Sequence, residues 1–361
     1  MAAALATCGI TTAAEASTGW SVQSTPNPSG SSADLLGVAC TAATNCTAVG
    51  SQQGTGNLAT LAEHWNGTTW AIQTTANPAG STYSELTGVA CTSASNCIAV
   101  GYANSSTGYE TLAERWNGTT WTIQTTPSPA GAMLFAVSCT SASACTAAGV
   151  SNSGTLAERW NGTTWATQTT PNPSGATYSE LDGVSCASAS RCVGVGFSSN
   201  GTLAERWNGT TWTIQATPNP SGSGPSFNGV SCTATANCTA VGSVTVSGSS
   251  KTLSEIWNGT TWAIQTTPSP SASVLVSVSC ASASSCTATG AQDISAAPDQ
   301  KTLAEGWNGT SWSTQTTPGT SGVGAELAGV SCPSTTDCTA TGWINTNSIA
   351  YLTLAEQWTG S

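Results

Sequence analysis

Apolar and polar residues alternate in short runs along most of this chain, and the runs come in groups of four. In one group the alternating runs are residues 181–186, 192–196, 202–207 and 212–216. Runs of this length with period two predict short β-strands, which we denote A to D in chain order. Each group ends in a segment such as 217–222, Thr-Pro-Asn-Pro-Ser-Gly, where proline blocks further ladder pairing. The pattern therefore predicts repeated four-stranded antiparallel sheets.

Two sets of residues show that this group recurs seven times. Fourteen of the fifteen cysteines form C-x5-C pairs, whose first members are 51, 48, 47, 46, 48 and 52 residues apart. Between consecutive pairs stands the segment Trp-Asn-Gly-Thr-Thr-Trp or a close variant of it. Repeats of this length that each form one sheet indicate a propeller. We expect an all-β fold, a seven-bladed β-propeller with four antiparallel strands per blade.

The two ends of the sequence carry complementary halves of one repeat. The sequence stops shortly after Trp358, on the turn, and residues 17–23 supply the strand that should follow this turn. A linear solenoid would instead need polar caps. We therefore expect the N-terminal strand to complete the last blade, with residues 17–361 as one propeller domain. Residues 1–16 are expected to be an N-terminal tail or the remnant of an export signal.

The Asn-Gly dipeptide between strands C and D predicts their register. Asn-Gly is the strongest short hairpin signal, because both residues tolerate positive φ in a two-residue type I′ turn. With the dipeptide at the centre of the first such turn, Trp65 is expected opposite Thr68, and Glu63 opposite Trp70. Large side chains then share one face of the blade and small ones the other, which suits blades stacked around an axis.

Each C-x5-C pair brackets the connection between strands A and B. Zinc is the alternative to a disulfide, but two cysteines with no nearby histidine or third cysteine do not complete a tetrahedral site within one blade. Seven regular disulfides imply an oxidising compartment, so we expect a secreted or cell-surface protein, with Cys8 of the tail unpaired. The expected bridges are Cys40–Cys46, Cys91–Cys97, Cys139–Cys145, Cys186–Cys192, Cys232–Cys238, Cys280–Cys286 and Cys332–Cys338.

Charge is scarce and predominantly acidic, which disfavours some partners. Lys and Arg number 6 against 17 Asp and Glu, so the formal net charge is −11. Such a chain does not neutralise phosphates, so neither nucleic acid nor an anionic membrane surface is an expected partner. No apolar run reaches the roughly 20 residues of a transmembrane helix. We expect a monomer without a transmembrane segment.

The Trp-Asn-Gly-Thr-Thr-Trp turn resembles the Asp-box of sialidase-type propellers, in which an Asp/Asn-Gly turn precedes an aromatic residue on strand D. The repeat length is also similar to that of kelch repeats and of secreted bacterial propellers with near-identical blades. The resemblance covers residues 17–361 and implies architecture only. The arginine triad and the tyrosine nucleophile of sialidases have no counterpart at matching positions, so no catalytic residue is carried over.

In a propeller the D–A and B–C loops share one rim, and the A–B and C–D turns share the other. From the second cysteine to the first tryptophan of each repeat, the spacing is 15 residues in two repeats and 19 to 21 in the others. The opposite rim hardly varies. Because function concentrates on variable loops of a rigid scaffold, we expect the ligand on the D–A/B–C rim.

Acidic residues at the head of strand A are the candidate ligand-binding groups. Four repeats carry an acid six residues before the first cysteine, namely Asp34, Glu85, Glu180 and Glu326. Their carboxylates are expected to converge near the mouth of the central channel and to bind Ca²⁺ or sugar hydroxyls. Tyr83 and Tyr178, two residues upstream of two of these acids, would stack on a sugar face. The alternative is a solvated acidic rim without a ligand.

These features favour a non-enzymatic binding propeller that recognises a glycan or an extracellular protein partner at several similar clefts. The glutamate that recurs in every strand C, first as Glu63, is expected to be structural, buried and hydrogen-bonded to backbone or indole N–H groups. One alternative is a structural or partner-docking scaffold. The other is a glycoside hydrolase or lyase that uses an asymmetric pair from the set Asp34, Glu85, Asp182, Asp293, Asp299 and Glu326.

Overall fold

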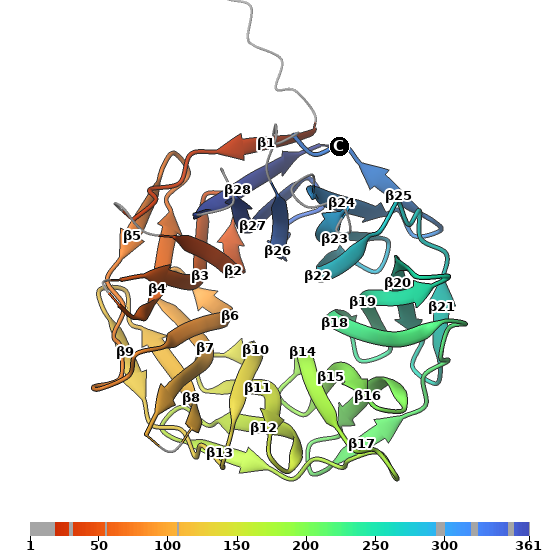
Figure 1. Ribbon diagram of the computed structural model, residues 1–361, viewed down its shortest axis with the longest axis horizontal. Coiled ribbons are helices and arrows are strands. Elements are labelled where there is room, and N and C mark those ends of the chain that lie inside the picture. Colours follow the sequence, from red (N-terminus) through yellow and green to blue (C-terminus); the bar gives the residue numbers. More distant parts are fainter. Residues whose placement is uncertain are drawn as a thin grey trace, which may run out of the picture.

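Seven four-stranded antiparallel sheets surround a central channel in the computed structural model of the protein (Figure 1). The structure describes residues 19–28, 32–54, 56–106, 108–293, 300–318, 324–345 and 350–360. In blades 1 to 6 the chain passes from the innermost strand A outwards to strand D and then begins the next blade. The predicted seven-bladed propeller is confirmed.

The strands of the described residues divide among the blades as follows. Blade 1 consists of β2 (Ala33–Ala42), β3 (Asn45–Gln53), β4 (Leu58–Trp65) and β5 (Trp70–Gln73). Blade 2 consists of β6 (Ser84–Ser93), β7 (Asn96–Ser105), β8 (Gly108–Trp116) and β9 (Trp121–Gln124). Blade 3 consists of β10 (Met133–Ser141), β11 (Ala144–Ser151), β12 (Gly154–Trp160) and β13 (Trp165–Gln168). Blade 4 consists of β14 (Ser179–Ser188), β15 (Arg191–Ser198), β16 (Gly201–Trp207) and β17 (Trp212–Gln215).

The remaining blades follow the same order. Blade 5 consists of β18 (Ser223–Ala234), β19 (Asn237–Val246), β20 (Ser249–Trp257) and β21 (Trp262–Gln265). Blade 6 consists of β22 (Val274–Ser282), β23 (Ser285–Gln292), β24 (Lys301–Trp307) and β25 (Trp312–Gln315). Blade 7 consists of β26 (Ala325–Ser331), β27 (Asp337–Asn345), β28 (Tyr351–Thr359) and β1 (Gly19–Gln23).

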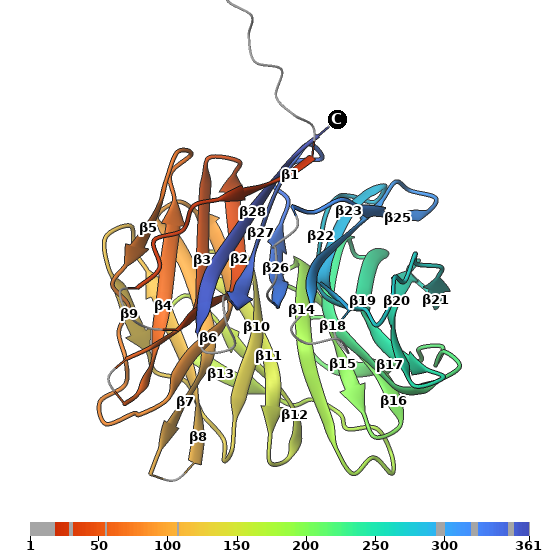
Figure 2. The same ribbon diagram turned by 45° about the horizontal axis from the view of Figure 1, so that its top comes forward.

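Blade 7 is completed by the N-terminal strand, as the sequence predicts. Strand β1 pairs antiparallel with β28, with Trp20 opposite Trp358, and Figure 2 shows the two strands side by side. In blade 1 the same position of the ladder joins Trp65 and Trp70. The two chain ends thus reproduce the C–D ladder of a continuous blade, which leaves β28 no unpaired edge at its outer side.

The predicted two-residue turn between strands C and D is wrong. Trp65 pairs with Trp70 rather than with Thr68, so the connection is a four-residue loop. The Asn66 side-chain oxygen accepts hydrogen bonds of 2.9 Å from the backbone N–H groups of both Thr68 and Thr69, and Gly67 adopts a φ of +94°. This Asx-type turn replaces the type I′ turn. The pairing shifts by two residues, so the prediction of which side chains share a face still holds.

The core lies between neighbouring blades rather than within any one sheet. In the layer between blades 4 and 5, Val195 and Ala204 of blade 4 pack against Phe227, Trp257 and Trp262 of blade 5. The large face of each blade therefore meets the small face of the preceding one, as expected. Because burial of apolar area drives folding, a single blade is not expected to be stable without its neighbours.

The innermost strands touch one another around the channel. A β-bulge follows Leu35 in β2, and a Cβ added to Gly37 would lie 3.1 Å from the Cα of Gly88 in blade 2. Farther along strand A, the Cys40 backbone N–H donates a hydrogen bond of 2.9 Å to the Ser331 hydroxyl of blade 7. At four other blade interfaces a cysteine backbone N–H likewise donates a hydrogen bond to a serine hydroxyl of the preceding blade. The innermost ring is therefore held by polar contacts as well as by close backbone approach.

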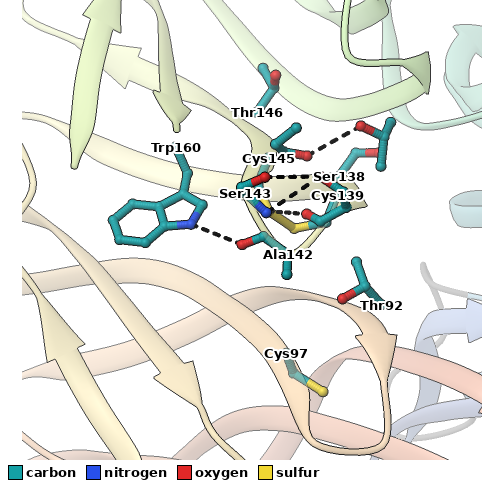
Figure 3. Close-up of a disulfide and its surroundings, with 12 residues drawn as sticks. Thr92, Cys97, Ser138, Cys139, Ala142, Ser143, Cys145, Thr146 and Trp160 are labelled. Atoms are coloured by element: carbon teal, nitrogen blue, oxygen red, sulfur yellow. Dashed lines mark hydrogen bonds between the residues drawn. A yellow bond between two sulfur atoms is a disulfide. The ribbon is translucent and has the colours of Figure 1, made fainter. Parts of the chain in front are cut away.

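The seven predicted disulfides are confirmed, one in each blade. Cys139 and Cys145 lie directly opposite each other on β10 and β11, as in the close-up of Figure 3. The Cα atoms of the seven bridged pairs are 3.9 to 4.0 Å apart. Beside this bridge the Trp160 indole N–H donates a 3.2 Å hydrogen bond to the Ala142 carbonyl in the A–B turn. Cys8 and the rest of residues 1–16 lie outside the described residues.

Candidate functional site

The two rims of the ring differ in charge. The strand ends at the D–A/B–C rim carry the acids Asp34, Glu85, Glu110, Glu180, Asp182, Asp293 and Glu326. All four arginines, Arg115, Arg159, Arg191 and Arg206, stand at strand ends next to the A–B and C–D turns. Lys251 and Lys301 also lie on the D–A/B–C rim, and Asp337 lies on the other. The excess of acids on the D–A/B–C rim nevertheless creates a field that favours neutral or cationic partners there.

A tyrosine cluster marks blade 2 on this rim. The Tyr83 and Tyr102 rings are stacked with centroids 5.7 Å apart, and Tyr109 meets both rings edge-on, at 6.2 and 5.4 Å. Phe135 of blade 3 meets Tyr102 edge-on at 6.4 Å. Tyr109 is 44% exposed, whereas Tyr83 and Tyr102 are half-buried. The result is a rigid aromatic surface at the boundary between blades 2 and 3.

The Glu85 carboxylate accepts hydrogen bonds from two of these tyrosines. Its Oε2 atom accepts hydrogen bonds from the hydroxyls of Tyr102, at 2.6 Å, and of Tyr83, at 3.1 Å. Burial, followed by these contacts to Glu85, raises the pKa of the Tyr102 hydroxyl. Tyr102 is therefore a neutral donor to a carboxylate, and this charge-assisted pair fixes the cluster in one arrangement.

Blade 4 carries a simpler version of the same arrangement. The Tyr178 hydroxyl donates a hydrogen bond to Glu180, and its ring lies 5.8 Å from that of Phe197. Burial and the neighbouring Glu180 raise the pKa of the Asp182 carboxyl well above its ordinary value. Phe197 also lines a cleft of about 420 Å³ between blades 4 and 5, which continues along Asn200 and Pro225. Sequence reasoning did not find this cleft.

The other two rim acids have partners of their own. Asp34 Oδ1 accepts hydrogen bonds of 2.9 Å from the backbone N–H and from the hydroxyl of Ser51. Burial raises the pKa of the Asp34 carboxyl, although these two bonds counteract the effect. Glu326 accepts a 3.3 Å hydrogen bond from Gln300 and lines the central channel, which Asp182 also lines. Burial raises the pKa of Glu326 as well.

The four predicted rim acids do not converge on one calcium site. They belong to blades 1, 2, 4 and 7, and each accepts hydrogen bonds from residues of its own blade or of an adjoining blade. In the described part of the chain, no three histidine, cysteine or acidic side chains come together as metal ligands would. Of the other acids considered for hydrolysis, Asp293 pairs with Lys301 at 3.4 Å, and Asp299 lies outside the described residues.

The glutamate repeated in strand C is buried, as predicted, but its predicted hydrogen bonds are mostly absent. Glu114 accepts a 3.1 Å bond from the Ala76 backbone N–H, whereas most copies accept none among the described residues, and none accepts from an indole. All seven copies are fully buried between blades: Glu63, Glu114, Glu158, Glu205, Glu255, Glu305 and Glu356. Burial raises the pKa of each carboxyl, to about 8 for Glu63 and about 7 for Glu114. Some indole N–H groups donate to other acceptors, such as Trp65 to the Ala43 carbonyl and Trp212 to the Gln168 side chain. Among the described residues, the indole N–H groups of Trp165, Trp207, Trp257, Trp262 and Trp312 have no acceptor.

Tyr102 and Tyr109 belong to this candidate site but do not follow from the sequence pattern alone. The signal was available in part, because Tyr102 lies opposite Glu85 in the β6–β7 ladder. In the same ladder position Phe197 lies opposite Glu180 and Trp343 opposite Glu326. An aromatic residue thus accompanies three of the four rim acids, and the cysteine hairpin fixes which residues are opposed.

Comparison with known proteins supports the fold and does not show a family. The sequence matches no protein-family model and no curated protein. Among solved structures, one described as YCF48 bound to D1 peptide has a TM-score of 0.56 at 13% identity, over 95% of this chain and 96% of that one. YCF48 from Cyanidioschyzon merolae scores 0.57 at 13% identity, over 94% and 98% of the two chains. The structure of U3-55K scores 0.61 at 10% identity, over 94% and 98%. None of the described residues forms a helix that would span a membrane.

Proposed function

We propose that this protein is a secreted, non-enzymatic binding propeller that docks an extracellular protein partner on its D–A/B–C rim. The observation that carries the proposal is the tyrosine cluster of blade 2. Tyrosine is enriched among the few residues that dominate binding energy in protein interfaces. Because Glu85 and Phe135 already hold Tyr102 in place, little side-chain entropy is lost when a partner settles on Tyr83 and Tyr109.

The charge of the rim supports a partner whose contact surface is neutral or basic. Acidic residues stand at the heads of four of the seven A strands, and the arginines lie at the other rim. Complementary charge raises the rate of encounter and excludes strongly acidic partners. The similar fold of YCF48 bound to D1 peptide supports peptide docking on a propeller of this size. The seven disulfides support secretion, since such bonds persist in oxidising compartments.

The proposal is tested with a photo-crosslinking amino acid at position 109, in protein applied to living cells of the species that makes it. The same amino acid at position 351 is the control, because Tyr351 has the same exposure of 44% but belongs to blade 7. We expect one protein adduct from position 109 and none from position 351. Tyr109→Ala should then weaken binding of the purified partner about tenfold. Equal adducts from both positions, or none from position 109, would refute the docking surface.

Carbohydrate recognition on the same rim is the second candidate, and Tyr178 favours it. This ring is 47% exposed and stands beside a carboxylate that accepts hydrogen bonds, Glu180. An aromatic face with a hydrogen-bonding neighbour is a suitable site for one sugar residue. Binding to arrayed glycans that Tyr178→Ala abolishes and Tyr109→Ala leaves intact would favour this function over protein docking.

A further inference from the structure

Grooves of one design recur on the outer circumference of the ring, away from the rim just described. Each lies where strand D of one blade ends beside the C–D turn of the next. They have volumes of about 470, 390 and 520 Å³ at the interfaces between blades 7 and 1, 3 and 4, and 5 and 6. These volumes are in the range of pockets that hold small ligands.

The lining of these grooves is aromatic and polar but carries no charge. In the groove between blades 3 and 4, the segment from Gln168 to Pro171 forms one wall, and Trp207, Thr211 and Trp212 form the other. The other two grooves repeat this set of residue types. Two indole rings, several hydroxyls and one amide favour a neutral ligand with both apolar C–H faces and many hydroxyls. A charged ligand would find no counter-ion in the groove.

Part of the lining is already fixed in orientation by the protein itself. The Asn208 side-chain amide donates a 3.0 Å hydrogen bond to the Thr211 hydroxyl oxygen, which leaves the hydroxyl proton of Thr211 to be donated elsewhere. The Trp212 indole N–H donates a 3.0 Å hydrogen bond to the carbonyl oxygen of the Gln168 side chain. This bond leaves the amide N–H groups of Gln168 as donors. A ligand therefore meets donors that are already positioned.

The groove between blades 5 and 6 contains one of several buried indole N–H groups without an acceptor among the described residues, although Gln265, the counterpart of Gln168, lines the same groove. Trp312 lines this groove, is 6% exposed, and its indole N–H has no hydrogen-bond acceptor in the described part of the chain. The equivalent donor in the groove between blades 3 and 4 is satisfied by Gln168. A buried N–H without a hydrogen bond is energetically unfavourable. A ligand oxygen in the groove would supply the acceptor.

We propose that these inter-blade grooves each bind one neutral saccharide residue, so that the ring is a multivalent carbohydrate-binding surface. The Thr and Gln groups hydrogen-bond the sugar hydroxyls, and the small accessible part of the largely buried indole rings contacts its C–H groups. Single sites of this size bind weakly, but several on one rigid ring give avidity toward a polysaccharide or a dense glycan layer. The inference does not depend on the function proposed for the D–A/B–C rim.

Three groove-filling substitutions test the inference in the full-length, oxidised protein. Ser24→Trp, Thr169→Trp and Thr266→Trp, combined in one variant, place a bulky ring in all three grooves. The matched control combines Ser21→Trp, Ala166→Trp and Ala263→Trp, exposed strand-D positions that line none of these grooves. The probe is an array of immobilised neutral mono- and oligosaccharides, followed by calorimetry with the best soluble binder.

We expect the wild type and the control variant to bind the same neutral glycan equally within about twofold, with more than one site per chain. The groove variant should lose at least tenfold of the array signal while it keeps the thermal midpoint of the control. Tyr109→Ala and Tyr178→Ala, which change the rim alone, should leave this binding unchanged. Wild-type protein that binds no neutral glycan, a stoichiometry of one, or a groove variant that binds like the control would each overturn the inference. Stronger binding of a proline-rich peptide than of any neutral glycan in the grooves would also overturn the inference.

Discussion

Trp20 and Trp358, which are separated by almost the whole sequence, lie directly opposite each other, with ring centroids 5.9 Å apart. The Trp20 indole N–H also donates a 3.0 Å hydrogen bond to the Gln315 side chain of blade 6. One residue near the N-terminus thus joins the last strand of blade 7 to the outer strand of the preceding blade. In the other blades the equivalent tryptophan pair is joined by a short loop of the same hairpin.

Trp20→Ala should destabilise the ring by about 3–5 kcal/mol, because it removes a buried aromatic side chain and weakens the C–D strand pair of blade 7, whose two strands come from opposite ends of the sequence. Chemical denaturation followed by tryptophan fluorescence measures the loss. Val22→Ala is the control, since Val22 belongs to the same strand and is 55% exposed. Equal stability of the two variants would contradict closure by β1.

Stability should fall as the pH rises, because seven carboxyls are buried between the blades. Burial raises the pKa of Glu63, Glu205 and Glu356 to about 8, against 4.5 in an exposed carboxyl. Between these values the folded state keeps protons that the unfolded chain has released. These groups therefore contribute most to the free energy of unfolding below about pH 4.5, and their contribution decreases as the pH rises through about 8.

Glu63→Gln isolates one of these carboxyls. The amide is neutral at every pH, so the variant should lose less stability than the wild type between pH 6 and 9. Denaturant midpoints at four pH values within this range give the slope. Glu110→Gln is the control, because that residue is exposed on the rim. A slope unchanged by Glu63→Gln would mean that this carboxyl is ionised in the folded protein at neutral pH.

Each disulfide should contribute about 2 kcal/mol, the value expected for a closed loop of this small size. Replacing both Cys139 and Cys145 by alanine should lower the free energy of unfolding by that amount and leave the circular dichroism spectrum intact. Thiol titration of the non-reduced, folded wild type checks the pairing independently. Many accessible thiols would refute the bridges, since all fourteen cysteines concerned are paired.

Ala39→Ser should stabilise the protein by about 0.5–1.5 kcal/mol. At five blade interfaces a serine at this position accepts a hydrogen bond from the cysteine N–H of the next blade, as Ser331 does from Cys40. Ala39 and Ala90 leave the equivalent Cys91 and Cys139 N–H groups without that acceptor. The thermal midpoint should rise in Ala39→Ser and remain unchanged in Ala42→Ser, an exposed position of the same strand. An unchanged thermal midpoint in Ala39→Ser would show that the Cys91 backbone N–H already has another acceptor.

The number of blades, the disulfides and the closure of the ring could all be predicted from the amino-acid sequence. These features depend on residues that recur at a fixed spacing, and pairing within a blade is local in the chain. Even here one local detail was misjudged, because Asn-Gly also begins a four-residue loop, as at Asn66, and no periodicity distinguishes this from a two-residue turn. Since both loops preserve the alternation of faces, the error did not affect the fold.

The positions of the candidate sites follow from the packing of the folded ring and could not be predicted from the repeat. The cluster in blade 2 consists of residues at or beside the ends of different strands, namely Tyr83, Tyr102 and Tyr109. Pairing within blade 2 and packing on Phe135 bring them together around Glu85. The grooves between Gln168 and Trp212, and their equivalents, exist only where two blades meet. The four rim acids occupy equivalent positions in the repeat, but in the structure they belong to different blades and have different hydrogen-bond partners. Repeats specify each blade through local pairing, whereas sites between blades depend on distances that the repeat pattern does not contain.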